Sequence, residues 1–276
     1  MGTTTGFIGF SGVPEGSYVP AVNVLSHFPN DDAELDISPD FRMTLRKMGK
    51  KDGTTKIKAL QEFIEQCEQS SIDVLKSVLP FWPRIFTRLT VDSDRKVREN
   101  AAKAHSLYAI RLGRSLAPQL KDLMGAWYTS QCDTYTPASS VAVNSLKTCF
   151  PDKKLSNAVT FCHDEIMDFI YDSVFKDEQV SADQKERILV GALAGYSLLL
   201  QQICCDGCDE EKVTAKHTQF WKNSKLYRVV QKESSPLVKQ AWFGLVYSLA
   251  EFMPYFTQGT NCLGFTLIPY SENSGD

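Results

Sequence analysis

The stretch DRKVRENA, residues 94–101, carries the clearest structural signature in the chain. Asp94 can cap a helix, Val97 and Arg98 follow inside the helix, and the small Ala101 comes one turn later. This order is typical of the second helix in a repeat made of two antiparallel helices. A weaker copy, SPLVKQA, occupies residues 235–241. The sequence therefore predicts a stack of helical hairpins.

Helical periodicity extends to both sides of this stretch. Apolar residues recur at spacings of three and four in the segments 57–67, 74–89, 162–170, 188–203 and 238–252. We expect Thr54 or Thr55 to cap the first of these helices, and Pro80 and Pro83 to kink or split the second. No alternating strand pattern competes with them. The predicted fold class is therefore all-α, a HEAT/ARM-like helical-repeat solenoid with irregular spacing and an extended N-terminal arm.

Several conspicuous residues are assigned to the packing of this fold. The large apolar positions expected in the core are Phe81, Trp82, Ile85 and Val97. The segment GALAG, residues 191–195, predicts a close approach between helices because its small side chains let two backbones come near each other. These residues are interpreted as structural.

Composition divides the chain into three parts. Residues 1–40 are rich in Gly, Pro, Ser and Asp and predict an extended arm. Two aromatic islands, GFIGF at 6–10 and YVPA at 18–21, are either short linear contacts or straps onto the chain's own domain. Residues 41–258 form the predicted HEAT-like helical repeat domain. Residues 259–276 are a C-terminal tail or the truncated start of another repeat.

Hydropathy and cysteine usage indicate a cytosolic protein. The longest strongly apolar run, residues 188–200, is shorter than the roughly 20 residues that a membrane helix needs. The N-terminus lacks the charged and apolar regions of a secretion signal. Eight cysteines are scattered without disulfide spacing, and no Asn-x-Ser/Thr sequon occurs. We therefore expect no membrane association and a reducing cytosol.

No catalytic motif is found, so the predictions are no catalytic residues, no metal and no cofactor. Phosphate-binding, dinucleotide-binding, metalloprotease and serine-hydrolase patterns are all missing. Cys205 and Cys208 have the spacing of half a zinc site near His217, but Cys204 and these two are more simply a thiol cluster at a helix end. We expect His163 to lie on a helix surface.

Charge is distributed unevenly. Residues 41–121 hold seventeen Lys and Arg against eight Asp and Glu, although the whole chain has a net charge of −3. This is the electrostatic pattern of a surface that binds a polyanion, and the alternative is a solvated face. The candidate binding residues in the densest stretch are Arg42, Arg46, Lys47, Lys50, Lys51, Lys56 and Lys58.

A polar and aromatic segment, residues 127–138, joins two predicted helices. Asp133 or Thr134 can cap the following helix, which Thr136 and Pro137 can start. Solenoids also display loops of this kind along one edge, where they serve in recognition. Asp133, Thr134 and Tyr135 are therefore a second candidate binding surface.

The sequence resembles the N-terminal region of the listerin family of RING-type E3 ubiquitin ligases. Four blocks over residues 6–175 carry the resemblance: GFIGF with YVPA, residues 40–63, residues 79–86 with 94–99, and QCDTYTPA at 131–138. Beyond about residue 180 the resemblance rests on helical pattern alone. It implies a long HEAT/ARM-like solenoid that clasps the 60S ribosomal subunit during quality control of stalled translation.

The resemblance also implies partners. The N-terminal end would dock beside the subunit interface, near a partner of the nuclear export mediator factor type. A distant C-terminal RING would recruit a ubiquitin-conjugating E2 to mark the nascent chain. This sequence has no RING cysteine and histidine set, so its expected role is non-catalytic docking. The alternative is a generic HEAT-repeat adaptor, like a transport receptor, that binds a protein and makes no ribosome contact.

Overall fold

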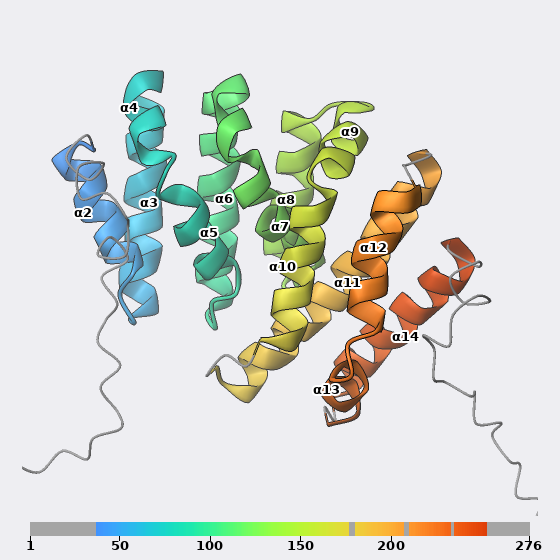
Figure 1. Cartoon of the computed structure of the whole chain (residues 1–276). Coiled ribbons are helices and arrows are strands. Elements are labelled where there is room, and N and C mark those ends of the chain that lie inside the picture. Colours follow the sequence, from blue (N-terminus) through green and yellow to red (C-terminus); the bar gives the residue numbers. More distant parts are fainter. Residues whose placement is uncertain (1–36, 177–179, 207–209, 233–234, 253–276) are drawn as a thin grey trace, which may run out of the picture.

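The computed structural model describes residues 37–176, 180–206, 210–232 and 235–252 (Figure 1). Within these ranges every regular element is a helix, as predicted. In chain order the elements are α2 (Pro39–Met48), α3 (Gly53–Gln69), α4 (Ile72–Val78), α5 (Trp82–Thr90), α6 (Arg95–Leu112), η1 (Gly113–Gln119), α7 (Leu120–Thr129), η2 (Ser130–Cys132), α8 (Thr136–Cys149), α9 (Lys154–Phe161), α10 (His163–Phe175), α11 (Ala182–Asp206), α12 (Glu210–Trp221), α13 (Leu226–Lys232) and α14 (Pro236–Phe252).

Helix starts follow local capping chemistry. Asp94 caps α6, as predicted, because its Oδ1 accepts a hydrogen bond of 2.8 Å from the backbone N–H of Lys96. The predicted cap of α3 is wrong. Asp52, and not Thr54 or Thr55, is its N-cap, and the Asp52 carboxylate accepts from the backbone N–H of Thr55. Because Asp52 is the cap, α3 begins at Gly53, earlier than a cap at Thr54 or Thr55 would allow.

The start of the described chain lies slightly before the expected domain boundary. Ser38 caps α2, and Ile37 is buried against the core two residues before that helix begins. The predicted arm otherwise lies outside the described residues, as do both aromatic islands and the predicted segment 259–276.

The two prolines after α4 divide the predicted helix, as expected. α4 ends at Val78 and α5 begins at Trp82, with Pro83 in its first turn. Phe81 and Trp82 are both buried, and so are Ile85 and Val97. The four core assignments made from the sequence are therefore confirmed.

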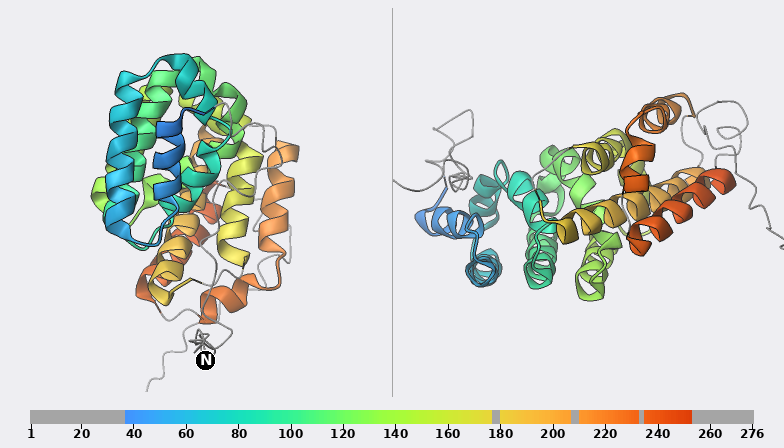
Figure 2. Two further views of the ribbon diagram at one scale, coloured as in Figure 1. Left: turned by 90° about the vertical axis from the view of Figure 1, so that its left-hand side faces the viewer. Right: turned by 90° about the horizontal axis from the view of Figure 1, so that it is seen from below.

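The first half of the solenoid is a regular stack of two layers. α3 packs on α6 and α6 packs on α8, so these three helices form one row (Figures 1 and 2). α2 packs on α3, and α5 packs on both α6 and α7. Aromatic rings fill the space between the layers. Phe63 stacks on Trp82 at 4.5 Å between ring centroids, and His105 meets Trp127 edge to face at 4.3 Å.

Neighbouring repeats are also joined through backbone groups at helix ends. The guanidinium of Arg111, on α6, donates hydrogen bonds of 2.8 and 2.7 Å to the carbonyl oxygens of Glu68 and Ser70. Carbonyls at a helix C-terminus have no partner within the helix. Arg111 therefore completes the end of α3 from the following repeat.

The row changes direction after α8. α11 packs along α14 and also contacts α10 and α7, so it crosses the end of the stack instead of extending the row (Figure 2). Glycines permit the close approaches at this point. A Cβ on Gly125 would lie 2.5 Å from Cβ of Phe169, and one on Gly195 would lie 3.0 Å from Cγ2 of Thr129.

The predicted close packing of residues 191–195 is confirmed at Gly195 and not at Gly191. No heavy atom lies within 4 Å of where a Cβ on Gly191 would be. That glycine faces a cavity instead. In the described parts of the chain, no helix combines the length and apolar character that crossing a membrane requires.

Candidate binding surfaces

The predicted basic stretch lies on the first hairpin of the solenoid. Arg42, Arg46 and Lys47 belong to α2, Lys50 and Lys51 lie in the turn, and Lys56 and Lys58 belong to α3. The hairpin brings all seven residues to one end of the molecule (Figure 1).

Arg42, Lys47 and Lys56 each contact a partner inside the protein. Arg42 donates to the carbonyl oxygen of Ile37 at 3.2 Å, and Lys47 forms an ion pair of 2.8 Å with Glu62. Lys56 forms an ion pair with Asp92 in which both side chains are largely buried. These contacts connect α2 to α3 and α3 to the next repeat. Arg42, Lys47 and Lys56 therefore have structural roles that the sequence did not reveal.

The other four cations are the exposed ones. Arg46, Lys50, Lys51 and Lys58 are all exposed. The side chains of Lys50, Lys51 and Lys58 make no ion pair or hydrogen bond with any other residue that the structure describes. A phosphate could approach these three lysines without displacing an internal partner. We define these four residues as the N-terminal basic surface.

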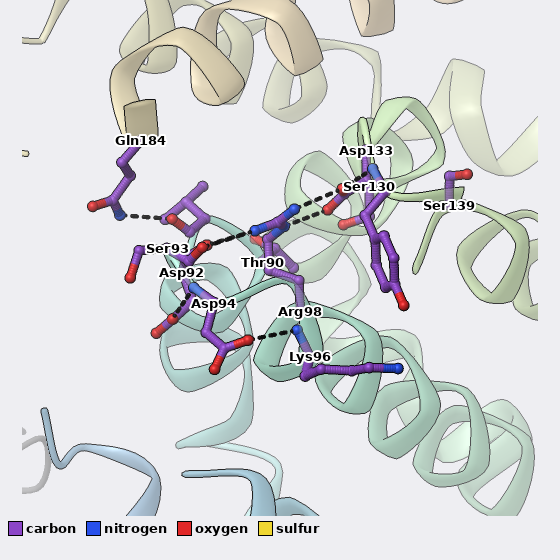
Figure 3. Close-up of polar contacts among 12 residues, drawn as sticks. Thr90, Asp92, Ser93, Asp94, Lys96, Arg98, Ser130, Asp133, Ser139 and Gln184 are labelled. Carbon is purple, nitrogen blue, oxygen red and sulfur yellow. Dashed lines mark hydrogen bonds and ion pairs between the residues drawn. The ribbon is translucent and has the colours of Figure 1, made fainter. Parts of the chain in front are cut away.

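The second predicted surface is divided between interior and exterior. Asp133 turns inward, where its carboxylate pairs with the guanidinium of Arg98 through bonds of 2.7 and 3.1 Å (Figure 3). Side-chain exposure is 5% for Arg98 and 10% for Asp133. Such a two-point contact between buried partners fixes geometry. Asp133 is therefore a structural residue and not an exposed recognition group.

Arg98 also holds the turn that precedes its own helix. It donates to the carbonyl oxygens of Asp92 and Ser93 at 2.9 and 3.4 Å (Figure 3). The arginine of the repeat signature thus connects the start of α6 to the segment before α8. The sequence identified Arg98 as part of a fold signature, but its partner lies 35 residues away and could not be identified from spacing.

Thr134 and Tyr135 are the two predicted residues of this loop that solvent can reach. Thr134 is exposed, and Tyr135 is half-buried beneath two cations. The guanidinium of Arg95 lies 5.3 Å from the ring centroid of Tyr135, and the ammonium of Lys96 lies 5.6 Å from it. Tyr135 is the N-cap of α8 without a side-chain cap bond, and Asp133 accepts from its backbone N–H. This edge of the solenoid therefore presents an aromatic ring beneath two positive charges.

The histidine expected on a surface is buried. His163 is only 5% exposed, and its Nε2 lies 3.4 Å from Nε2 of His217. The other nitrogen of His217 hydrogen-bonds to the hydroxyl of Tyr196, which also accepts from Trp221. The prediction failed because the partner, His217, comes from a helix 54 residues further along the chain. Burial, and then the neighbouring His163, lower the pKa of His217 to about 3.

Of the four cysteines whose side chains the structure describes, Cys67 and Cys162 are buried and Cys132 and Cys149 are partly buried. Burial raises the pKa of Cys67 and Cys162 to about 12 and that of Cys132 and Cys149 to about 11. Their thiolates are scarce at neutral pH, which makes them poor nucleophiles. In the described ranges, His, Cys, Asp and Glu side chains do not gather into a group that could hold a metal ion. The side chains of Cys204, Cys205 and Cys208 lie outside what the structure describes.

Comparison with known proteins gives one consistent result. The family model for the E3 ubiquitin-protein ligase listerin, N-terminal domain, matches residues 35–262. The chain is 36% identical to listerin of Gallus gallus and 35% identical to that of Mus musculus, in each case over 92% of the chain. Listerin of Drosophila melanogaster is 29% identical over 94% of the chain.

The match extends well past residue 175, where the resemblance found by motif weakened. The chain spans about 15% of the length of the Gallus gallus and Mus musculus relatives. Its matched residues correspond to the N-terminal domain of that family, and its fold is the helical-repeat solenoid described above. The chain therefore belongs to the listerin family.

Proposed function

We propose that this chain is the ribosome-docking N-terminal part of a listerin-type E3 ubiquitin ligase and that it binds the 60S subunit of stalled, split ribosomes. Its relatives carry the name E3 ubiquitin-protein ligase. In this proposal the catalytic work belongs to a RING elsewhere in the full-length protein. The N-terminal solenoid holds the ligase on the subunit while the RING directs ubiquitination of the stalled nascent chain.

The observation that carries the proposal is the N-terminal basic surface. Arg46, Lys50, Lys51 and Lys58 are exposed on one hairpin. Ribosomal RNA offers a dense array of phosphates, and lysine and arginine contacts to phosphates position a protein without reading sequence. A docking domain needs that kind of contact because it must fix orientation on a large surface.

The remaining partners follow from the same proposal. A nuclear export mediator factor-type protein would lie beside the docked solenoid on the 60S subunit, and the ubiquitin-conjugating E2 would meet only the RING. All of this would take place in the cytosol. The ring of Tyr135, with Arg95 and Lys96 above it, is a second place where the solenoid could contact the 60S subunit.

Co-sedimentation with isolated 60S and 40S subunits over a salt series tests the proposal. We expect selective 60S binding that weakens steeply with salt. The triple variant Lys50→Glu/Lys51→Glu/Lys58→Glu should weaken this binding strongly and reduce its salt dependence. Because each phosphate contact contributes roughly 0.7–0.9 to the slope of log K against log salt, the loss of three contacts lowers the slope by about 2–3.

A matched control separates site-specific contact from bulk charge. Lys147, Lys153 and Lys154 are also exposed, and they lie at the far end of α8 and the start of α9. Their triple change to Glu alters the net charge equally and should leave 60S binding nearly unchanged. Equal losses in the two variants, or a flat salt response, would refute ribosome docking through the basic surface and favour a protein-binding adaptor.

A further inference from the structure

The change of direction in the solenoid leaves a cavity of about 50 Å³ where α11 crosses α5 and α7. Its wall includes hydroxyl groups, two arginines and one glycine of α11: Thr90, Ser130, Thr134, Arg98, Arg187 and Gly191. One water needs roughly 10–15 Å³ of such space, so the cavity can take a group of a few heavy atoms. It lies away from the N-terminal basic surface, which is formed by α2, α3 and the turn between them.

Arg187 supplies a positive charge to this cavity without a matching anion. Its Nη2 is buried and has no hydrogen-bond partner among the residues that the structure describes. A buried donor without an acceptor costs stability, and a charged one costs more. This Nη2 donor is therefore available to an acceptor that enters the cavity.

The nearby carboxylates do not satisfy Arg187. Asp133 is bound to Arg98, and Asp92 is paired with Lys56. Asp183 is exposed and forms no ion pair within the described residues. Burial, followed by repulsion from Arg98, lowers the pKa of Arg187 in spite of attraction from these three carboxylates. Arg187 therefore forms no ion pair with any of the three.

A larger groove of about 260 Å³ continues from the cavity. The two share Val91, Phe169, Ser173 and Ile188, so they form one connected depression. The groove adds apolar side chains such as Val174 and Val180, and its cations include Arg88 and Lys185. A further cation, Lys176, is already paired with Asp172. The depression therefore fits a chain that carries one buried anion beside apolar groups.

This combination favours a carboxylate over a nucleic acid. A carboxylate is small and planar, so it can accept two hydrogen bonds from a guanidinium. A nucleic-acid backbone carries a phosphate at every nucleotide and is held by charged and polar groups along its length. Apolar side chains such as Val174 and Val180 alternate with the cations of the groove, and the carboxylate of Asp172 would repel a phosphate backbone.

We propose that the depression between α5, α10 and α11 is a docking site for an acidic peptide segment of a partner protein. An Asp or Glu side chain of the segment enters the cavity and pairs with Arg187. An adjacent apolar side chain packs on Phe169 and Ile188. This site is additional to ribosome docking and does not depend on it.

Fluorescence anisotropy with a defined probe tests the site on the full chain. The probe is the fluorescein-labelled, C-terminally amidated peptide Gly-Leu-Asp-Glu-Leu-Asp, and its control has Asn and Gln in place of the acids. We expect saturable binding of the acidic peptide only. Arg187→Met should weaken that binding roughly tenfold to hundredfold, since a hydrogen bond to a charged group contributes about 1.5–3 kcal/mol.

Two further variants make the result specific. Gly191→Leu fills the cavity without changing charge and should also remove binding, because that position has free space for a side chain. Arg114→Met removes an exposed arginine outside the depression and should have no effect. Arg187→Met should leave the thermal unfolding midpoint unchanged or raise it, whereas a purely structural arginine would lower it.

The opposite outcomes overturn the proposal. They are the absence of saturable peptide binding in the millimolar range, equal binding by the Arg187→Met and wild-type chains, or preference for a labelled oligouridine that is lost on Arg187→Met. Ribosomal subunits play no part in the assay, so its failure would leave ribosome docking untouched.

Discussion

The two halves of the solenoid bury their aromatic residues in different ways. In the first half, α3, α6 and α8 stack in register, and Phe63, Trp82, His105 and Trp127 form one continuous series between the layers. In the second half, α11 crosses the stack, and the aromatic cluster gathers around Tyr196. The stacked first half fills the space between its layers with side chains. The second half leaves a cavity where α11 crosses the stack.

The comparison teaches where a helical repeat protein can place a binding site. A regular stack fills the space between repeats with side chains, as protein interiors generally do. Where α11 crosses the stack, side chains do not fill all the space against the neighbouring helices. A cavity therefore remains beside α11, together with the Nη2 of Arg187, which has no partner among the described residues. The irregular spacing that weakens the repeat signature in the sequence thus coincides with the depression beside α11.

The largest expected effect on stability comes from breaking a buried ion pair in the first half, compared with breaking an exposed pair in the second half. Arg98→Ala leaves the carboxylate of Asp133 buried without its partner and should cost about 3–5 kcal/mol in the free energy of unfolding. Lys216→Ala breaks the pair with Asp168, whose side chain is 58% exposed, and should cost less than about 1 kcal/mol. Urea unfolding followed by circular dichroism measures both. Similar losses would contradict the central role of Arg98.

The second prediction concerns acid. Burial lowers the pKa of His105 to about 3, and His217 has a pKa of about 3, against an ordinary value of 6.5. Below pH 6.5 the unfolded chain takes up a proton at each ring and the folded chain does not. Each histidine should therefore cost about 1.4 kcal/mol of stability per pH unit as the pH falls below 6.5, with the stabilisation complete above that value.

Substitution separates the two histidines. His105→Gln or His217→Gln should each remove about half of the acid-dependent loss measured by urea unfolding between pH 7 and pH 5. A slope that stays unchanged in the His217→Gln variant would mean that the folded second half takes up a proton at the His217 ring. That result would sharpen the difference between the halves, because the ring of His105 is fully enclosed.

The third prediction tests the close contact at the change of direction. Gly125→Ala would place a methyl group 2.5 Å from Cβ of Phe169 and 3.2 Å from the carbonyl oxygen of Glu165. Relief requires a shift of α10 against α7, so we expect a loss of about 1–3 kcal/mol. Thermal unfolding of the variant checks this value. An unchanged midpoint would show that the two helices separate easily.

The smallest effect has the opposite sign. Gly191→Ala adds a methyl group where no heavy atom lies within 4 Å. Alanine is favoured over glycine inside a helix by about 0.5–1 kcal/mol, so the variant should be more stable by that amount. Differential scanning calorimetry of this variant beside Gly125→Ala makes a matched pair. Destabilisation by Gly191→Ala would mean that the cavity is closed in solution.

Sequence pattern predicted the fold because the fold rests on local rules. Helical spacing, the Asp94 cap and the break at Pro80 and Pro83 all depend on residues a few positions apart, and all were confirmed. The cap of α3 was misassigned to Thr54 or Thr55 because Asp52 lies before the apolar pattern begins. Errors of this kind move a helix end and leave the architecture intact.

The candidate surfaces were less predictable because their chemistry depends on distant partners. The charge of Lys56 is balanced by Asp92, and that of Arg98 by Asp133, 36 and 35 residues away along the chain. A count of charged residues in the sequence treats Lys56, Arg98 and Asp133 as free to bind a partner, although the fold has already paired them. Arg187 was missed for the converse reason, since only the folded chain shows that a neighbouring carboxylate already has another partner.

The hydrogen bonds from Arg111 to the end of α3 bear on how the chain emerges during its own synthesis. Glu68 and Ser70 leave the ribosome about forty residues before Arg111 does, which at roughly 5–20 residues per second is a delay of several seconds. Until Arg111 is available, the carbonyl oxygens of Glu68 and Ser70 can accept hydrogen bonds only from water. The first hairpin therefore has to wait for its neighbour, and the earliest unit able to complete its structure during translation is the segment from α2 through α6.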